Sequence, residues 1–206
     1  MNKILLAMLM SIVSITASAR EWEGNNNGRY GGCVVEGTLV TMKNGTQKPI
    51  EKIVEQDRIL TNTQEDFSPL LRIRGSENIP LYRVKMSSGK AVVATEGHPF
   101  ITEAGLTLVS KELKPGLVLQ TIDGPEEVDS VNLVSPGKVV YNIIVASDEA
   151  ISKAQRSDVE ARNAGFSTVE YQRRMDPFLG LSSAQHTYYI NGIASGDLVI
   201  QQSIKN

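Results

Sequence analysis

The sequence contains a single cysteine, Cys33, among its 206 residues. Exported domains usually use cysteines in pairs, because an oxidising compartment makes disulfides persist, so one cysteine excludes an intramolecular disulfide framework. Composition alone leaves two ordinary explanations for Cys33, a small buried apolar side chain or an intermolecular disulfide. Its neighbours, two glycines before it and two valines after it, require a closer look at the surrounding motifs.

The sequence also lacks an excess of basic residues and any second long apolar run. Lys and Arg total 21 against 23 acids, so no basic surface favours a nucleic-acid partner or an anionic membrane surface. We therefore expect no nucleic acid among its partners. A length of 206 residues with 41% hydrophobic content suffices for one packed domain.

Residues 1–19 have the pattern of a secretory signal peptide. Lys3 forms a short basic region, an apolar run extends from Ile4 to about Ile15, and Ala17-Ser18-Ala19 matches the small-residue cleavage pattern. The apolar run is shorter than the ~20 residues that span a bilayer. We expect an exported, periplasmic or secreted protein with no stable membrane span after signal removal. Losing Lys3 leaves 20 bases against 23 acids, a net charge of −3.

After the predicted cleavage site, residues 20–32 are polar and rich in Gly and Asn. Such a segment cannot bury enough apolar surface to fold, so we expect a short disordered peptide that ends at Gly32. The predicted domain therefore covers 33–206.

From Cys33 onward, short β-branched runs alternate with Gly, Pro, Asn and Ser, which predicts an all-β domain of twisted hairpins. Asn44-Gly45 is a predicted turn between two such runs. Residues 147–184 break this texture with a Ser147 cap and good helix formers, which predicts a small helical insertion near the C-terminus. No internal repeat is visible. The expected strand-forming runs are 34–42, 48–53, 57–61, 69–75, 80–86, 90–95, 105–110, 116–122, 127–134, 138–146 and 186–202.

Several motifs, in order, resemble the Hint domain family, the self-processing modules of inteins and Hedgehog proteins. The first runs from Cys33 through Gly37-Thr38 to QDRIL, and TEGHPF then places Thr95 and His98 in a T-x-x-H pattern. The later segments ELKPGLVL, KVVYNIIV and HTYYINGI are also similar to the family. The resemblance covers 33 to 200 except the insertion, and it implies the Hint-type twisted β-hairpin (horseshoe) fold.

The resemblance implies a reaction at the Gly32–Cys33 bond. Cys33 would attack the Gly32 carbonyl and convert the amide into a thioester. His98 would supply the proton that the leaving nitrogen needs, and Thr95 would hold the scissile peptide or the oxyanion. His186 matches the later histidine that assists inteins at the far end. No cofactor or metal site is implied.

The C-terminal end departs from the splicing pattern. Gly196 stands where inteins have a histidine, Asp197 where they have an asparagine, and Leu198 where the next nucleophile would be. Splicing is therefore not expected, and Asp197 is interpreted as a turn residue. The segment LLRIRGSEN has no acid at the position of the Hedgehog sterol-activating aspartate. The acceptor of the thioester would then be water or a small amine or thiol, and the substrate is the protein's own N-terminal peptide.

Two further functions stay open from the sequence. One is a catalytically inactive exported Hint scaffold that acts as a binding module through its helical insertion. The other is a cysteine hydrolase that uses Cys33 and His98 on other molecules, although the sequence shows no separate substrate motif.

Overall fold

The structure, a computed structural model, describes residues 21–23, 32–63, 66–78, 80–149, 152 and 183–204. Strands dominate these residues, which confirms the all-β prediction, and one short α-helix lies near the C-terminus. The predicted signal peptide, 1–19, lies outside the described residues, as does most of the predicted insertion. Within 147–184, Asp148, Glu149 and Ser152 are helical and a 3-10 helix begins at Ser183.

Fifteen strands lie in the part of the chain that the structure describes. They are β1 (Glu21–Glu23), β2 (Val34–Val35), β3 (Leu39–Thr41), β4 (Gln47–Pro49), β5 (Ile59–Leu60), β6 (Asp66–Glu77), β7 (Leu81–Met86), β8 (Ala91–Ala94), β9 (Pro99–Ile101), β10 (Thr107–Val109), β11 (Val118–Thr121), β12 (Gly124–Val134), β13 (Lys138–Ala146), β14 (Thr187–Ile190) and β15 (Ile193–Gly196). The helices are the 3-10 helices η1 (Ile50–Lys52), η2 (Ser110–Glu112) and η4 (Ser183–His186) and the α-helix α3 (Leu198–Ile204).

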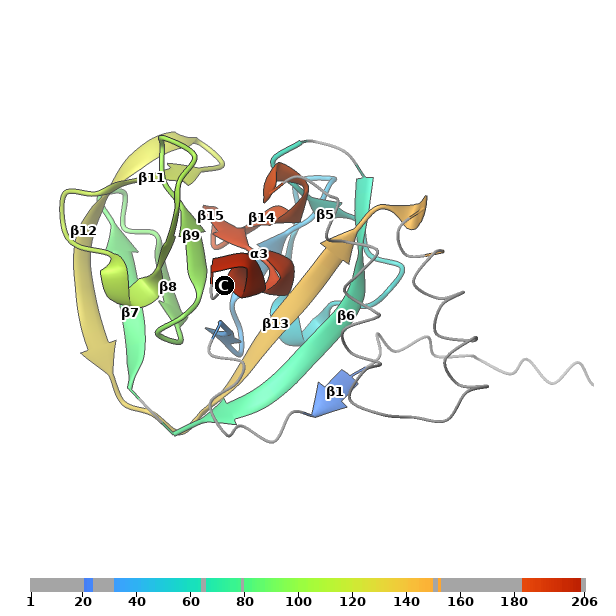
Figure 1. The fold of residues 1–206 in the computed structure, drawn as a ribbon, viewed down its shortest axis with the longest axis horizontal. Helices are drawn as coiled ribbons and strands as arrows, with labels where there is room; N and C mark the ends of the chain where they lie inside the picture. Colours follow the sequence, from blue (N-terminus) through green and yellow to red (C-terminus); the bar gives the residue numbers. More distant parts are fainter. Residues whose placement is uncertain are drawn as a thin grey trace, which may run out of the picture.

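Two long antiparallel pairs form the arms of the molecule. β13 pairs with β6 in one arm, and β12 pairs with β7 in the other. The arms meet at one end and diverge, with β14, β15 and α3 between them, which agrees with the expected horseshoe shape (Figure 1). The short strand β2 bridges the arms, because it pairs with β13 on one side and β8 on the other. The residues just before β2 therefore lie between the two arms.

The structure contains an internal repeat that the sequence does not reveal. The unit β3–β4–η1–β5 and the unit β9–β10–η2–β11 share their backbone hydrogen bonds, each residue of the second unit lying 60 positions after its counterpart. Met42 N–H donates to Thr46 O as Thr102 N–H does to Leu106 O, and the turn 35–38 matches the turn 95–98. Identities between the units are few, since strand and turn geometry depends on residue class rather than residue identity.

Three predicted features differ from the structure. The run 186–202 is not strand to its end, because β15 ends at Gly196 and the α-helix α3 begins at Leu198. Residues 48–53 are not one strand, because β4 ends at Pro49 and η1 begins at Ile50. Pro49 has φ −57° and leads the chain into the helical turn, where Ile50 is buried. The predicted disorder of 20–32 does not hold for Glu21–Glu23, which pair in parallel with β6 through backbone hydrogen bonds.

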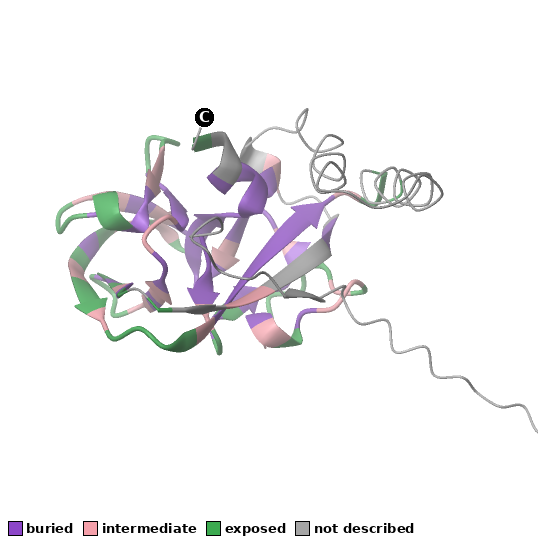
Figure 2. Ribbon diagram, turned by 60° about the horizontal axis from the view of Figure 1, so that its bottom comes forward, coloured by how far each residue is buried: buried purple, intermediate pink, exposed green. Residues whose placement is uncertain are grey.

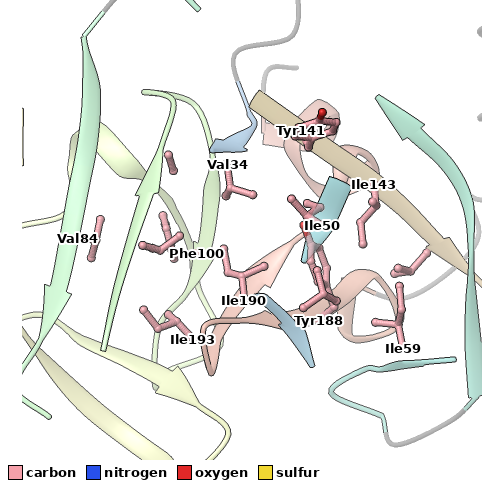
Figure 3. Close-up of a cluster of buried hydrophobic side chains, with 14 of the residues drawn as sticks. Val34, Ile50, Ile59, Val84, Phe100, Tyr141, Ile143, Tyr188, Ile190 and Ile193 are labelled. Atoms are coloured by element: carbon pink, nitrogen blue, oxygen red, sulfur yellow. The ribbon is translucent and has the colours of Figure 1, made fainter. Parts of the chain in front are cut away.

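The hydrophobic core holds the central elements together, and buried residues concentrate there while the peripheral hairpins are exposed (Figure 2). Core side chains from both arms and from the central strands meet in one cluster (Figure 3). Val34 and Phe100 belong to it, as do Tyr141 and Ile143. Each is one or two positions from a polar residue of the site described below. Because successive strand side chains point to opposite faces, burial of Tyr141 and Ile143 turns Asn142, which lies between them, to the other face of β13. Phe100 lies two positions after His98 and packs against its ring.

Candidate functional site

The carbonyl oxygen of Gly32 accepts two side-chain hydrogen bonds. His98 Nδ1 lies 3.0 Å from it and Asn142 Nδ2 lies 2.6 Å from it. A carbonyl oxygen can only accept, so His98 Nδ1 carries a hydrogen in this arrangement. Asn142 is oriented by its own amide oxygen, which accepts the Ile143 N–H at 2.8 Å. Two donors from distant segments therefore converge on one peptide oxygen, as in an oxyanion hole.

The nitrogen of the same peptide is bound by Thr95. The Cys33 N–H donates to Thr95 Oγ1 at 2.8 Å, and the Thr95 N–H donates to the Cys33 carbonyl at 2.9 Å. Thr95 Oγ1 also donates to that carbonyl at 3.2 Å. The pairing of β2 with β8, through Val34 and Ala94, sets this register. Both ends of the Gly32–Cys33 peptide are thus held by side chains.

His98 is fully buried, and burial lowers the pKa of its imidazole to about 4, although the hydrogen bond to the Gly32 carbonyl partly opposes this. The ring is therefore neutral at neutral pH. Its other nitrogen, Nε2, lies 2.5 Å from Ser195 Oγ, which donates to it when Nδ1 carries the hydrogen. Phe100 packs edge-on against the ring at 5.2 Å between centroids. The tautomer and orientation that Gly32 requires are thus supported from the opposite side of the ring.

The side chain of Cys33 lies at the edge of an apolar cluster. Only 4% of the residue is exposed, and it packs with Leu81 and Val140. Since the sequence holds no second cysteine, an intramolecular disulfide is excluded. The Gly32 carbonyl and the Cys33 thiol therefore lie in surroundings of low polarity, which strengthens hydrogen bonds to the carbonyl. This burial also disfavours the hydrolase alternative, because a foreign substrate would need access.

The predicted residues Cys33, Thr95 and His98 come together, but His98 lies at a different atom than expected. His98 is beside the carbonyl oxygen of Gly32 and not beside the Cys33 nitrogen, whereas Thr95 holds that nitrogen and so contacts the peptide as expected. The reason is geometric. The turn from 95 to 98, closed by the His98 N–H to Thr95 carbonyl bond at 3.2 Å, places one side chain at the oxygen and the other at the nitrogen of the same peptide.

The fourth predicted residue, His186, is not at this peptide. It ends η4 and its Nδ1 lies 2.8 Å from Asp197 Oδ2. Asp197 is fully buried and accepts further bonds from the Val145 N–H at 3.0 Å and the Val199 N–H at 2.8 Å. Its position before α3 makes it an N-cap, a more specific role than the predicted turn residue.

Gly196, which replaces the histidine of splicing proteins, has no room for a side chain. A Cβ atom there would lie 2.8 Å from Ile200 Cγ2 and 3.0 Å from Pro99 Cγ. The close packing of α3 against the end of β15 thus requires glycine at this position. The structural reason agrees with the sequence argument that a proton donor is missing here.

Sequence reasoning missed Asn142, Ser195 and Gln201. Asn142 left a signal, because it is the one amide in the apolar run KVVYNIIVA, and a buried amide needs hydrogen-bond partners. Ser195 and Gln201 left none, since small and amide residues are common near strand and helix ends.

Among the described residues, no group of three His, Cys, Asp or Glu side chains could hold a metal ion. In the same part of the chain, no helix has the length and apolar character needed to cross a membrane.

Comparisons with known proteins identify the fold. No protein-family profile matches the sequence. A curated protein, DNA-directed RNA polymerase III subunit rpc2 of Dictyostelium discoideum, is 28% identical over 89 residues, which are 39% of this chain and 6% of that protein. The chain therefore spans a small fraction of the length of this relative.

Solved structures agree over about four fifths of the chain. The gp41-1 intein matches with a TM-score of 0.55 and 19% identity, covering 81% of this chain and 99% of that one. A bacterial intein-like domain from Clostridium thermocellum matches with 0.56 and 18%, covering 81% and 98%. A DnaB intein from Synechocystis sp. PCC 6803 matches with 0.53 and 14%, covering 81% and 98%.

Proposed function

Because the chain has the Hint fold of inteins and intein-like domains, we propose that it processes itself at the Gly32–Cys33 peptide through an N–S acyl shift. The observation that carries this proposal is the convergence of His98 and Asn142 on the Gly32 carbonyl oxygen, with Thr95 on the Cys33 nitrogen. An ordinary peptide in a β-protein needs no such pair of buried side-chain donors at one carbonyl, since ladder hydrogen bonds satisfy it.

The first step is an isomerisation. Cys33 Sγ bonds to the Gly32 carbonyl carbon, the bond from that carbon to the Cys33 nitrogen breaks, and the thiol proton ends on this nitrogen, which becomes an amine. Negative charge develops on the oxygen that His98 and Asn142 contact, so both hydrogen bonds strengthen in the transition state. The Thr95 hydroxyl, which can accept and donate, supports proton transfer at the nitrogen.

Neutral His98 acts here as a hydrogen-bond donor, not as a pre-formed acid, because an imidazole with a pKa of about 4 carries no extra proton at neutral pH. As the Gly32 oxygen becomes negative, it draws the Nδ1 hydrogen of His98 more strongly, and Nε2 of the ring becomes more basic. The Ser195 hydroxyl, 2.5 Å from Nε2, then donates a stronger hydrogen bond to that nitrogen. In the second step, water or a small amine or thiol attacks the thioester carbon, the C–S bond breaks and the thiol is restored.

We propose further that the reaction stops there, without splicing, and that the substrate is the protein's own peptide 20–32 after export by the signal at 1–19. The alternative is an inactive exported scaffold that binds a partner. The burial of Cys33 against Leu81 and Val140 favours that alternative, because an external acceptor would have to reach an enclosed thioester.

The test follows residues 20–206 by intact mass, with and without an added thiol. Thiols cleave thioesters and leave amides intact, so wild type should lose the peptide ending at Gly32 faster when the thiol is present. The Cys33→Ala variant should stay intact. If folded wild type with reduced Cys33 stays intact under both conditions, the scaffold function replaces self-processing.

A further inference from the structure

Gln201 of α3 reaches the scissile peptide from the far end of the domain. Only 2% of Gln201 is exposed, and its Oε1 lies 3.4 Å from Asn142 Nδ2, the same nitrogen that donates to the Gly32 carbonyl. The helix that carries Gln201 begins at the Asp197 cap and lies between the arms (Figure 1). The C-terminal helix is therefore part of the site.

Gly32 is buried directly against this side chain. If Gly32 carried a Cβ atom, the three heavy atoms nearest to it would be Cδ, Oε1 and Nε2 of Gln201, all in severe overlap. The φ angle of Gly32 is not in the left-handed region, unlike that of Gly37 or Gly45. Glycine before Cys33 is thus favoured by space and not by an unusual backbone conformation, which differs from the usual reason for a glycine in a tight site.

We propose that Gln201 is a specificity-determining residue that restricts the position before the nucleophile to glycine, an inference that rests on the proposed self-processing. The amide of Gln201 ends a flexible side chain and can rotate away from a larger residue. Rotation would remove the carbonyl that faces Asn142 and would loosen the hydrogen bond from Asn142 to the Gly32 oxygen. Selection against larger residues therefore acts through the same donor that stabilises the oxyanion.

A double-mutant cycle tests the proposal with Gly32→Ala, Gln201→Ala and the double variant, in residues 20–206. Gly32→Ala should slow cleavage on the order of 10- to 100-fold, the effect of a displacement of about 1 Å at a reacting group. In the Gln201→Ala background the same change should cost no more than about 3-fold, because the overlapping amide is gone. Alanine is a good helix former, so α3 should be preserved.

Ile204→Ala is the matched control, because Ile204 lies on the same helix but is 40% exposed. It should not rescue Gly32→Ala. Equal cost of Gly32→Ala in the wild-type and Gln201→Ala backgrounds would overturn the proposal.

Thermal unfolding of the same variants separates this proposal from self-processing. Gly32→Ala should lower Tm in the wild-type background and lower it less in the Gln201→Ala background, whether or not any variant cleaves. If Gly32→Ala does not fold, Gln201→Ala should restore folding, and a failure to do so counts against the contact. If no variant cleaves but the coupling in Tm is present, self-processing fails while the steric restriction stands.

Discussion

Two peptides of the domain, Gly32–Cys33 at the N-terminal junction and Asp197–Leu198 at the C-terminal junction, have different surroundings, although both are buried in the same central region. At the N-terminal junction, His98 and Asn142 contact the Gly32 carbonyl oxygen, which would become negative in the proposed reaction. At the C-terminal junction, the side chain of Asp197 accepts backbone N–H groups and His186, while Leu198 continues into α3. The first arrangement suits a change of charge on an oxygen, and the second suits a fixed helix start.

The same fold thus contains one peptide whose contacts suit a reaction and another whose contacts fix a helix start. A carboxylate held by Val145 N–H, Val199 N–H and His186 cannot turn toward its own carbonyl without breaking those buried hydrogen bonds. The internal repeat makes a similar point, because Thr38 and His98 occupy matching positions of the two units, and of these two residues His98 contacts the Gly32 carbonyl.

The largest expected effect comes from His98. His98→Ala should slow thioester formation by about 10²-fold or more, since it removes an oxyanion donor from a buried site. Thr38→Ala is the matched control in the first unit, where the Thr38 hydroxyl donates to the Val35 carbonyl at 2.7 Å, and it should leave the rate nearly unchanged in folded protein. Thiol-dependent cleavage measured by intact mass compares them, and equal rates for the two variants would remove His98 from the mechanism.

Asn142 and Thr95 should give smaller losses. Asn142→Ala removes the 2.6 Å donor but leaves His98, so we expect a loss of about 10- to 100-fold. Thr95→Ala should cost about the same, since the backbone bonds between β2 and β8 still hold the peptide. Single-turnover rates measure both, and an Asn142→Ala variant as fast as wild type would show that the carbonyl contact is structural only.

Stability should depend on pH through His98. Its pKa is about 4 when folded and about 6.5 when unfolded, so the unfolded chain binds more protons between these values and stability falls as the pH is lowered. The loss should reach roughly 3 kcal/mol between pH 6.5 and 4. Urea unfolding of wild type and His98→Gln measures this, because the carboxylates contribute equally to both. Parallel curves for the two proteins would show that folding does not lower the pKa of the His98 ring.

The smallest expected effect on bond cleavage comes from Asp197→Asn, which supplies the amide that splicing proteins use. The bond to Leu198 should stay intact, because Gly196 offers no proton and the residue is held as a helix cap. Loss of the charged acceptor should lower stability by ~1–3 kcal/mol. A fragment ending at residue 197 in the mass spectrum would show that the side-chain contacts do not prevent cyclisation.

Much of this molecule follows from local sequence patterns. Alternation and turn residues predicted most strands, and the turn at Asn44-Gly45 is present, with Gly45 at φ 81°. Cys33, Thr95 and His98 were found because their motifs are compact. The internal repeat was not found, because the two units share backbone geometry and few identical residues.

Long-range partners were the part that sequence could not supply. Asn142 is 110 positions from Gly32, and which face of β13 its amide occupies depends on how Tyr141 and Ile143 pack in the core. Gln201 reaches Gly32 because α3 begins directly after β15, at the Asp197 cap. The placement of His98 at the Gly32 carbonyl and not at the Cys33 nitrogen depends on the register of β2 against β8, which a motif does not specify.

The most direct test of self-processing at Gly32–Cys33 treats residues 20–206 with hydroxylamine, which converts a thioester into a hydroxamate. The masses of all products are then measured. Self-processing at Gly32–Cys33 predicts two products, a peptide with a hydroxamate at Gly32 and a fragment from Cys33 to Asn206 in which Asp197 and Leu198 are still joined. An intact chain, or a fragment that ends at Asp197, would contradict the assignment of chemistry to the N-terminal junction alone.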